Sequence, residues 1–406
     1  MNPLVPLLSN NHKMIDIIRM RKGTEFNIET LKDDLGISRT TADKLFQNVH
    51  ANKHFPLIMR KGKSLVIDGT LGYFLGISIG SEHIRVVVID LNFQPVDRNR
   101  ILIDDKIQAI PNFYHDESSD NSYAFKTPQK NANSLSELRD LLSQIVGLFL
   151  ALHQQKDASF NLLGIGFGVS GPVDYCAKVW VSSPRITDIQ NMTLLDIVGY
   201  DNEQTIRKEK IFVSLDNNAK TAVISEYQFL METHNGSYDK DIALLYIGSG
   251  LGFSAVIDQK LLRGSHNMFG EISHVPIITS PPSDESDYKI SSQNIEDALE
   301  KNGWKNMPRL LPYLLKMING LLGIDAFILV GHNIKKGQNL IPALMDQRTI
   351  FTVESTHRYC NYEVGRQEAS TSAIGAAIEA YMTLCAYQTD SENRMNLSHE
   401  IKWNTL

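Results

Sequence analysis

Residues 75–91, LGISIGSEHIRVVVIDL, decide the fold, because they predict a strand, a tight turn at Gly80 and a second strand. Such a hairpin is typical of the phosphate-binding end of an ATP-using domain. There, a carboxylate normally helps to hold magnesium beside the phosphates. The first strand of this hairpin carries Ser78 and no acidic residue. The sequence therefore raises the question of which carboxylate, if any, would bind the metal.

The chain after residue 68 alternates apolar strands with helices, as α/β proteins do. Apolar runs predict further strands at residues 162–173, 211–217, 242–248, 254–258 and 327–333. Helical periodicity predicts helices over 134–155 and 371–387. Two polar and irregular tracts, 104–133 and 279–294, are interpreted as loops.

The composition is that of a globular protein, with 42% of the 406 residues hydrophobic and 21% charged, which excludes disorder throughout. This length predicts two or three domains. The longest stretches without a charged residue have 16 residues and are broken by glycines, so no membrane span is expected. The first residues lack the features of a secretory signal, which predicts a cytoplasmic location. The three cysteines lie far apart and predict no disulfide framework.

The charge is divided unevenly along the chain. Residues 1–70 hold 11 Lys and Arg against 7 Asp and Glu, whereas the remainder holds 29 against 39. A basic first segment on an acidic body suggests that the two parts have different partners.

The first 68 residues predict a winged helix-turn-helix. Asn27 is placed to cap one short helix, Gly36 lies in a turn, and Ser38 is placed to cap a second helix. An apolar face at Met14, Ile17 and Ile18 predicts a helix before these two. Residues 55–68, FPLIMRKGKSLVID, then predict a hairpin with a basic tip.

In such a unit the second helix lies in the major groove, while the cations of the wing contact phosphate or the minor groove. The residues expected to contact DNA are Arg39, Thr40, Thr41 and Lys44 on the helix and Arg60, Lys61 and Lys63 on the wing. A small helical domain with a solvated charged face, or a winged helix used for protein contact, is the alternative. Because acidic side chains, Glu29 among them, limit the positive face, we expect a dimer that reads two half-sites.

Several motifs together resemble the ROK family of bacterial repressors and sugar kinases, and the resemblance covers nearly the whole chain. The motifs lie at residues 76–90, 166–174, 215–226, 247–274, 328–333 and 372–380. The resemblance implies an N-terminal winged helix-turn-helix followed by a two-lobed actin-like, hexokinase-like body with a ribonuclease H-like α/β fold. The expected domains are residues 1–68, a first lobe at 69–195 and a second lobe at 196–406.

The kinase chemistry of this family requires a carboxylate near the metal and a general base at the sugar hydroxyl. By resemblance, Ser78 replaces the acid, Glu82 replaces a phosphate-binding hydroxyl, and Asn218 replaces the base. A carboxamide is far too weak a base to accept the hydroxyl proton. Glycines survive in both phosphate loops, but glycines also serve tight turns; they are Gly80, Gly248, Gly250 and Gly252. We therefore expect no phosphoryl transfer and no cofactor.

Sugar recognition requires only amides, carboxylates and imidazoles around the hydroxyl groups. By resemblance, the candidate sugar-binding residues are Asn217, Asn218, Glu271, His274 and Glu296. Arg185 is a further candidate with two readings: it gives a preference for a sugar phosphate or sugar acid, or it is an interface or surface ion-pair partner. Family members often carry zinc-binding cysteines after the histidine, and residues 275–294 contain none, so no metal is expected.

These observations predict a sugar-responsive repressor that binds operator DNA as a homodimer, or as a tetramer, and binds a sugar or sugar-phosphate effector. Two alternatives remain: a ROK sugar kinase with a regulatory head, and a regulator whose effector is another protein.

Overall fold

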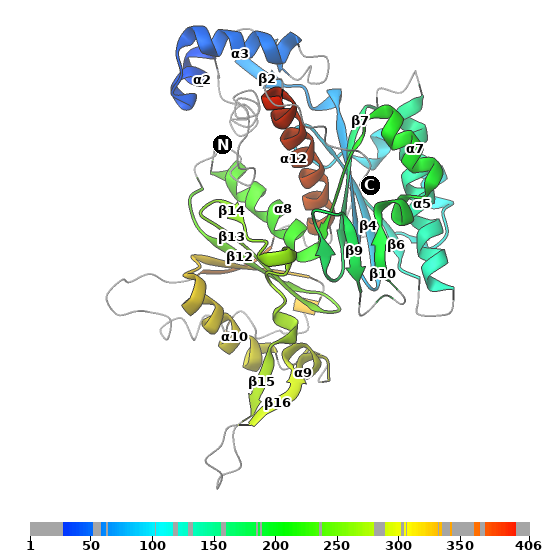
Figure 1. The fold of residues 1–406 in the computed structure, drawn as a ribbon, viewed down its shortest axis with the longest axis vertical. Helices are drawn as coiled ribbons and strands as arrows, with labels where there is room; N and C mark the ends of the chain where they lie inside the picture. The colour runs from blue at the N-terminus through cyan, green and yellow to red at the C-terminus, as the bar shows by residue number, and fades with distance from the viewer. Residues whose placement is uncertain are drawn as a thin grey trace. The chain divides into compact units, whose positions relative to one another are not determined.

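The computed structural model describes residues 27–51, 58–61, 64–116, 121–128, 133–155, 160–234, 238–279, 289–334, 342, 361–365 and 370–394, less positions 102, 184–185, 187–188, 302–303, 306 and 332. The helix expected around Met14 lies outside these residues. The chain forms two compact units: one comprises residues 1–238 and 370–406, and the other comprises residues 239–369 (Figure 1).

The N-terminal part of the first unit contains two helices and a hairpin. Helix α2 (Ile28–Leu35) and helix α3 (Arg39–Ala51) are joined by a turn at Gly36, whose φ of 63° is left-handed and suits glycine. Strands β1 (Ile58–Lys61) and β2 (Ser64–Ile67) pair antiparallel, so the expected hairpin is present.

A six-stranded sheet, ordered β11-β7-β3-β4-β6-β5, forms the centre of the first unit. The opening hairpin supplies β3 (Tyr73–Ile79) and β4 (His83–Asp90), which pair antiparallel. Strands β7 (Leu162–Val169) and β11 (Phe212–Asn217) lie on the other side of β3 and run parallel to it. The sheet therefore combines a hairpin with two parallel strands.

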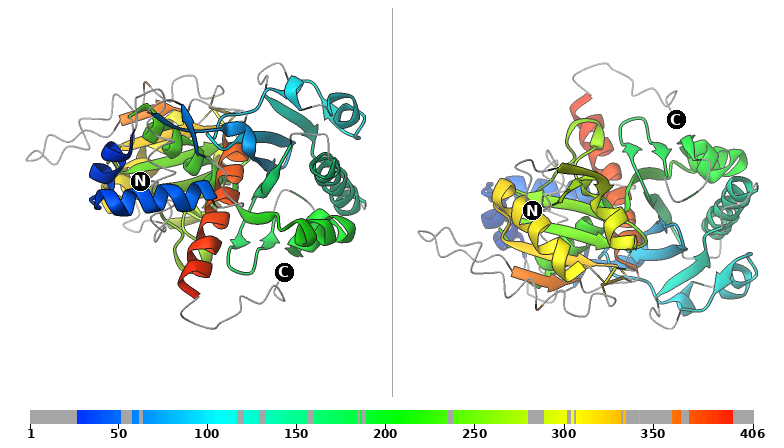
Figure 2. Two further views of the ribbon diagram at one scale, coloured as in Figure 1. Left: turned by 90° about the horizontal axis from the view of Figure 1, so that it is seen from above. Right: turned by 90° about the horizontal axis from the view of Figure 1, so that it is seen from below.

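Helices cover both faces of this sheet (Figure 2). One face is covered by α5 (Ser134–Gln154), whose buried side chains pack with Ile77 and Ile165. The other face carries α12 (Thr371–Arg394), which packs against β3 and β7 and against α8 (Asn218–Thr233). A smaller sheet of β8 (Val173–Asp174), β9 (Val179–Ser182) and β10 (Gln190–Thr193) continues into α6 (Leu194–Val198) and α7 (Tyr200–Glu209).

Glycines let α12 approach the strands at backbone distance. A Cβ atom on Gly76 would overlap the carbonyl oxygen of Ala373, and a Cβ atom on Gly166 would overlap that of Ala376. On the helix itself, a Cβ atom on Gly375 would overlap the carbonyl oxygen of Thr221 in α8. The packing therefore tolerates no side chain at these three positions.

The second unit repeats the same strand arrangement. Its sheet, ordered β14-β13-β12-β17-β18, places an antiparallel hairpin of β12 (Ile242–Ile247) and β13 (Leu251–Ile257) beside two strands that run parallel to β12, β17 (Ala326–Val330) and β18 (Asn361–Val364). Strand β14 (Lys260–Leu261) lies at the edge. Helices α9 (Ile295–Lys301) and α10 (Met307–Leu322) contribute buried side chains to its core. A hairpin and two parallel strands in each unit agree with the expected actin-like, hexokinase-like body.

The expectation that residues 104–133 form an irregular loop is wrong. They form α4 (Asp104–Gln108), β5 (Phe113–Tyr114) and β6 (Ser122–Lys126), and β6 pairs with β4 in the central sheet. The second polar tract likewise ends in a strand, β16 (Lys289–Asn294), which pairs with β15 (Pro276–Thr279). The sequence did not predict β5 and β6 because these short strands have polar residues on both sides.

The compact units also divide the chain differently from the expected boundary at residue 195. Strand β11 and helices α8 and α12 belong to the first unit, because they pack on its sheet.

Among the described residues, no helix has both the length and the apolar stretch that a membrane crossing would require.

Replacing Gly166 by alanine is expected to destabilise the first unit by about 3 kcal/mol, since the new methyl group overlaps the backbone of α12. Urea unfolding followed by circular dichroism measures the change. The matched variant Gly320→Ala in α10 meets no atom within 4 Å and is expected to be neutral or slightly stabilising. Equal stability of the two variants would contradict the close packing.

Candidate functional site

The two residues that stand at the expected chemical positions, Ser78 and Asn218, are hydrogen-bonded to each other. Ser78 lies in β3, and its hydroxyl donates to Asn218 Oδ1 over 3.0 Å. Asn218 is the first residue of α8, directly after β11, and only 7% of its surface is exposed. Both positions therefore belong to one buried polar cluster.

Two further hydroxyl groups complete this cluster, which we call the Asn218 cluster (Ser78, Asn218, Thr221 and Ser372). Ser372 Oγ, at the start of α12, donates to Asn218 Oδ1 over 2.7 Å, and Thr221 Oγ1 lies 2.7 Å from Ser372 Oγ. The Asn218 Nδ2 group donates to the carbonyl oxygen of Ile79 over 3.0 Å. The carboxamide thus receives two hydrogen bonds and gives one inside the protein.

This bonding specifies an amide rather than a carboxylate at position 218. An aspartate would place an oxygen acceptor where Asn218 Nδ2 now donates, opposite the Ile79 carbonyl oxygen. Two acceptors facing each other in a buried position repel, and neither hydrogen bonding nor solvation compensates. Gly168 leaves the space for the cluster, since a Cβ atom there would lie 2.8 Å from an oxygen of each of Asn218, Thr221 and Ser372.

Asn217 is also engaged with the backbone. Its Oδ1 accepts from the Ala219 amide over 2.8 Å as the N-cap of α8, and its Nδ2 donates to the Gly171 carbonyl oxygen over 2.9 Å. The two asparagines expected beside the sugar are therefore both held by groups of the first unit.

The turn of the first hairpin is closed by its own groups. The Gly80 amide donates to the His83 carbonyl oxygen over 2.9 Å, and the Gly80 carbonyl oxygen accepts from Thr127 Oγ1 over 2.7 Å. Glu82 lies on this turn with about half of its side chain exposed, and its carboxylate is 3.8 Å from His83 Nε2. The turn thus presents the Glu82 carboxylate at the position that, by resemblance, holds a phosphate-binding hydroxyl in the family's kinases.

A carboxylate also contacts the second glycine loop, residues 248–252. Glu296, in the first turn of α9, accepts from the Leu251 amide over 2.7 Å. The Gly248 amide donates to the Gly250 carbonyl oxygen over 3.0 Å, and Asn333 Nδ2 donates to the Gly248 carbonyl oxygen. Glu296 therefore supports the loop, an interaction that the sequence did not indicate.

Glu271 precedes the short helix Ile272–His274 in the second unit and His274 is its last residue; Glu271 is partly buried and His274 is exposed. Within the described part of the chain, neither side chain has a hydrogen-bonding or charged partner. Arg185 lies outside the described residues. No group of three His, Cys, Asp or Glu side chains that could hold a metal ion occurs among the residues for which side chains are described.

Both expected helix caps in the N-terminal part are present. Asn27 Oδ1 accepts from the Thr30 amide over 3.1 Å, and Ser38 Oγ accepts from the Thr41 amide over 3.2 Å. The Thr41 hydroxyl lies 2.8 Å from Ser38 Oγ, so this expected DNA-contacting group takes part in the cap. Leu31 and Ala42 are fully buried.

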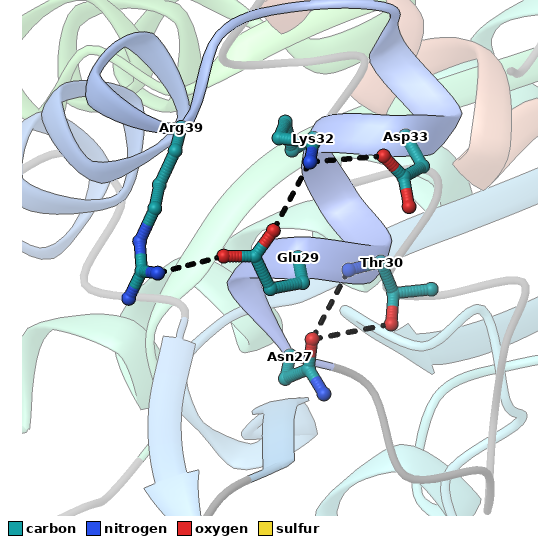
Figure 3. A network of polar contacts seen from close by, with 6 residues as sticks. All are labelled: Asn27, Glu29, Thr30, Lys32, Asp33 and Arg39. Carbon is teal, nitrogen blue, oxygen red and sulfur yellow. Dashed lines mark hydrogen bonds and ion pairs between the residues drawn. The ribbon is translucent and has the colours of Figure 1, made fainter.

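An ion-pair network joins α2 to the first residue of α3 (Figure 3). Arg39 Nη1 lies 2.9 Å from Glu29 Oε1, and Lys32 Nζ lies 3.1 Å from Glu29 Oε2 and 3.3 Å from Asp33 Oδ1. The hydrogen bonds of Lys32 to Glu29 and then to Asp33 raise its pKa above the usual value.

The other expected DNA-contacting residues are only partly described. Thr40 and Lys44 are exposed on α3. Arg60 and Lys61 lie in β1, the side chains of the hairpin are not described, and Lys63 lies outside the described residues.

Sequence reasoning missed Ser372 and Thr221 in the Asn218 cluster, Gly168 beside it, and Glu29 as the partner of Arg39. Ser372 lies 154 residues from Asn218, and no local pattern predicts their contact. Its place in the motif at residues 372–380 was the available signal.

The ROK family model matches residues 74–303, which is more than half of the chain. The xylose repressor of Caldicellulosiruptor bescii is 24% identical over 220 residues, which are 54% of this chain and 45% of that protein. The xylose repressor of Bacillus subtilis strain 168 is 25% identical over 224 residues, which are 55% and 47% of the two chains. The chain thus spans about half the length of the curated relatives it matches.

Two solved structures have the same fold. One is described as a ROK family transcriptional regulator, a homolog of the E. coli MLC protein, and it superposes with a TM-score of 0.61 and 15% identity over 94% of this chain and 100% of that chain. The other is a ROK family glucokinase from Streptomyces griseus, with a TM-score of 0.51 and 17% identity over 76% and 99%. At these sequence identities the superpositions show a shared fold and nothing further.

Replacing Asn218 by aspartate is expected to destabilise the first unit by about 1–3 kcal/mol at pH 8, because the carboxylate faces the Ile79 carbonyl oxygen. The loss is expected to be smaller near pH 4, where a protonated carboxyl can donate to that oxygen. Thermal unfolding at the two pH values measures it. Asn133→Asp, the same exchange at the exposed N-cap of α5, is expected to be neutral or stabilising. A stable Asn218→Asp protein at pH 8 would contradict this account of the cluster.

Proposed function

Since the chain belongs to the ROK family, we propose that it is a sugar-responsive transcriptional repressor whose body binds an effector without phosphorylating it. Residues 1–68 bind operator DNA as a winged helix-turn-helix, and the protein acts in the cytoplasm as a dimer or a pair of dimers. Its similarity to xylose repressors supports this reading.

The hydrogen bond between Ser78 and Asn218 is the observation that carries the proposal, because it supports a sensor over a kinase. A kinase needs a free carboxylate base and a second carboxylate near the metal. In this chain the two positions hold a hydroxyl and an amide that bond to each other. Glu296 and Glu82 add negative charge at the two glycine turns, where phosphate groups would have to bind.

DNA binding by residues 1–68 is supported by the two capped helices around Gly36 and by the hairpin after them. The exposed Thr40 and Lys44 and the guanidinium of Arg39 lie on the first turns of α3, the part of a recognition helix that reaches base edges. A net positive charge on residues 1–70 supports attraction to phosphate.

Effector binding is assigned to Glu271 and His274, whose side chains are available in the second unit. A carboxylate can accept hydrogen bonds from two adjacent hydroxyl groups, and an imidazole can accept or donate one. The polar groups of Asn217 and Asn218 are engaged within the first unit, and their contact with a sugar stays a prediction. Arg185 would add affinity for a phosphate or carboxylate on the sugar.

A sugar that weakens operator binding must itself bind less tightly to the DNA-bound protein, because coupling free energies are reciprocal. Thermal-shift screening against monosaccharides and their phosphates is expected to find a ligand that raises the melting temperature. At a ligand concentration of 100 times Kd, the gain in the free energy of unfolding is about 2.7 kcal/mol. Glu271→Gln is expected to remove most of this gain. If the effector is a protein, no sugar is expected to raise the melting temperature. The Glu271→Gln protein would then release DNA as the unaltered protein does.

No sugar of the same panel is expected to be phosphorylated with Mg-ATP in a coupled ADP-release assay. The double variant Ser78→Asp, Asn218→Asp is expected to stay inactive as well, because both carboxylates would be buried in the Asn218 cluster. Sustained sugar-dependent ADP release by the unaltered protein would refute the repressor reading in favour of the kinase.

A further inference from the structure

We propose that Glu29 is a specificity-determining residue for DNA binding, which weakens contacts of Arg39 with phosphate while leaving its contact with a base edge available. This inference rests on the proposed function. It follows from the ion pairs that join α2 to α3 and from the exposure of the residues that form them.

Arg39 is the first residue of α3, a place where a cation is unfavourable. The positive end of the helix dipole lies there, and the first turn of α3 contains no acidic residue. Glu29 supplies the missing negative charge from α2, with its Oε1 atom 2.9 Å from Arg39 Nη1. The ion pair therefore holds the guanidinium at the N-terminal end of the expected recognition helix.

Glu29 is itself held in place. Its second oxygen, Oε2, accepts from Lys32 Nζ over 3.1 Å, and Lys32 is fixed on its other side by Asp33. Asn27 caps the helix that carries all three residues. The carboxylate is consequently presented to Arg39 by an ordered helix, not by a long side chain extending alone into solvent.

Phosphate and guanine compete with Glu29 for Arg39 on different terms. Non-specific binding comes from neutralising phosphate charge, and an arginine already paired with a carboxylate gains less from a phosphate. A guanine offers two acceptors, O6 and N7, in the plane of the guanidinium. Glu29 occupies Nη1 alone in the described contacts, and the side chain is 71% exposed, so the other N–H donors remain accessible for a two-fold contact.

The consequence is a larger ratio of specific to non-specific affinity. Removing the charge of Glu29 strengthens binding to any duplex, but it strengthens phosphate contacts more than a base contact that the ion pair already permits. Asp33 provides the matched control, because it carries the same charge on the same helix and contacts Lys32 but not Arg39 in the described contacts.

The experiment uses the full chain and a duplex selected from a random library by the unaltered protein, together with a scrambled duplex of the same composition. Fluorescence anisotropy gives Kd for both duplexes at several salt concentrations. Glu29→Gln is expected to lower the ratio of the two affinities by about fivefold, the size of a strong exposed ion pair. For Glu29→Gln, the slope of log affinity for the scrambled duplex against log salt concentration should steepen by about one unit. Asp33→Asn is expected to change the affinities for the two duplexes by the same factor, which leaves their ratio unchanged.

In an Arg39→Gln background, Glu29→Gln is expected to change the ratio of specific to non-specific affinity no more than Asp33→Asn does, because the guanidinium that pairs with Glu29 is absent. Circular dichroism melting curves establish that each variant is folded before its affinities are compared. Equal effects of Glu29→Gln and Asp33→Asn on the ratio, or an unchanged ratio in Glu29→Gln, would overturn the inference while leaving DNA binding intact. Failure of the unaltered protein to bind any duplex would overturn the proposed function and this inference together.

Discussion

The contact of α12 with the central strands at backbone distance is the constraint on which the first unit depends. Gly76 and Gly166 on the sheet let the helix carbonyls of Ala373 and Ala376 lie against the strands, and Gly375 does the same toward α8. The hydrophobic side chains on the opposite face then pack under α5. Ser372 reaches Asn218 only because α12 lies this close, so the polar cluster is a product of the glycine packing.

The Asn218 cluster gives Ser78 and Asn218 a structural role, because these side chains bond to each other and Asn218 also bonds to Ser372. In an enzyme, two carboxylates would face a cavity that must remain polar, hydrated and able to hold a metal. In this chain, short uncharged groups satisfy one another, which avoids the free energy of burying charge. The hydrogen bonds of these groups connect β3, α8 and α12.

Local chemistry was predictable from the sequence, and long-range chemistry was not. The caps Asn27 and Ser38 and the turn at Gly36 follow from residue type and spacing, and all three are confirmed. Strand β6 was missed because its five residues lie in a polar tract and become a strand only by pairing with β4. The role of Glu296 on the Leu251 amide, across 45 residues, depends on how α9 packs and has no local signal.

The second unit is inserted between α8 and α12, so the chain leaves the first unit after residue 238 and returns at residue 370. This order has a consequence during synthesis. The sheet of the first unit is complete when residue 217 has been made, yet the helix that covers its glycine-lined face is translated more than 150 residues later. A nascent chain consequently carries an uncovered apolar sheet while the whole second unit emerges from the ribosome, which makes this interval the period of greatest exposure to aggregation and to chaperones.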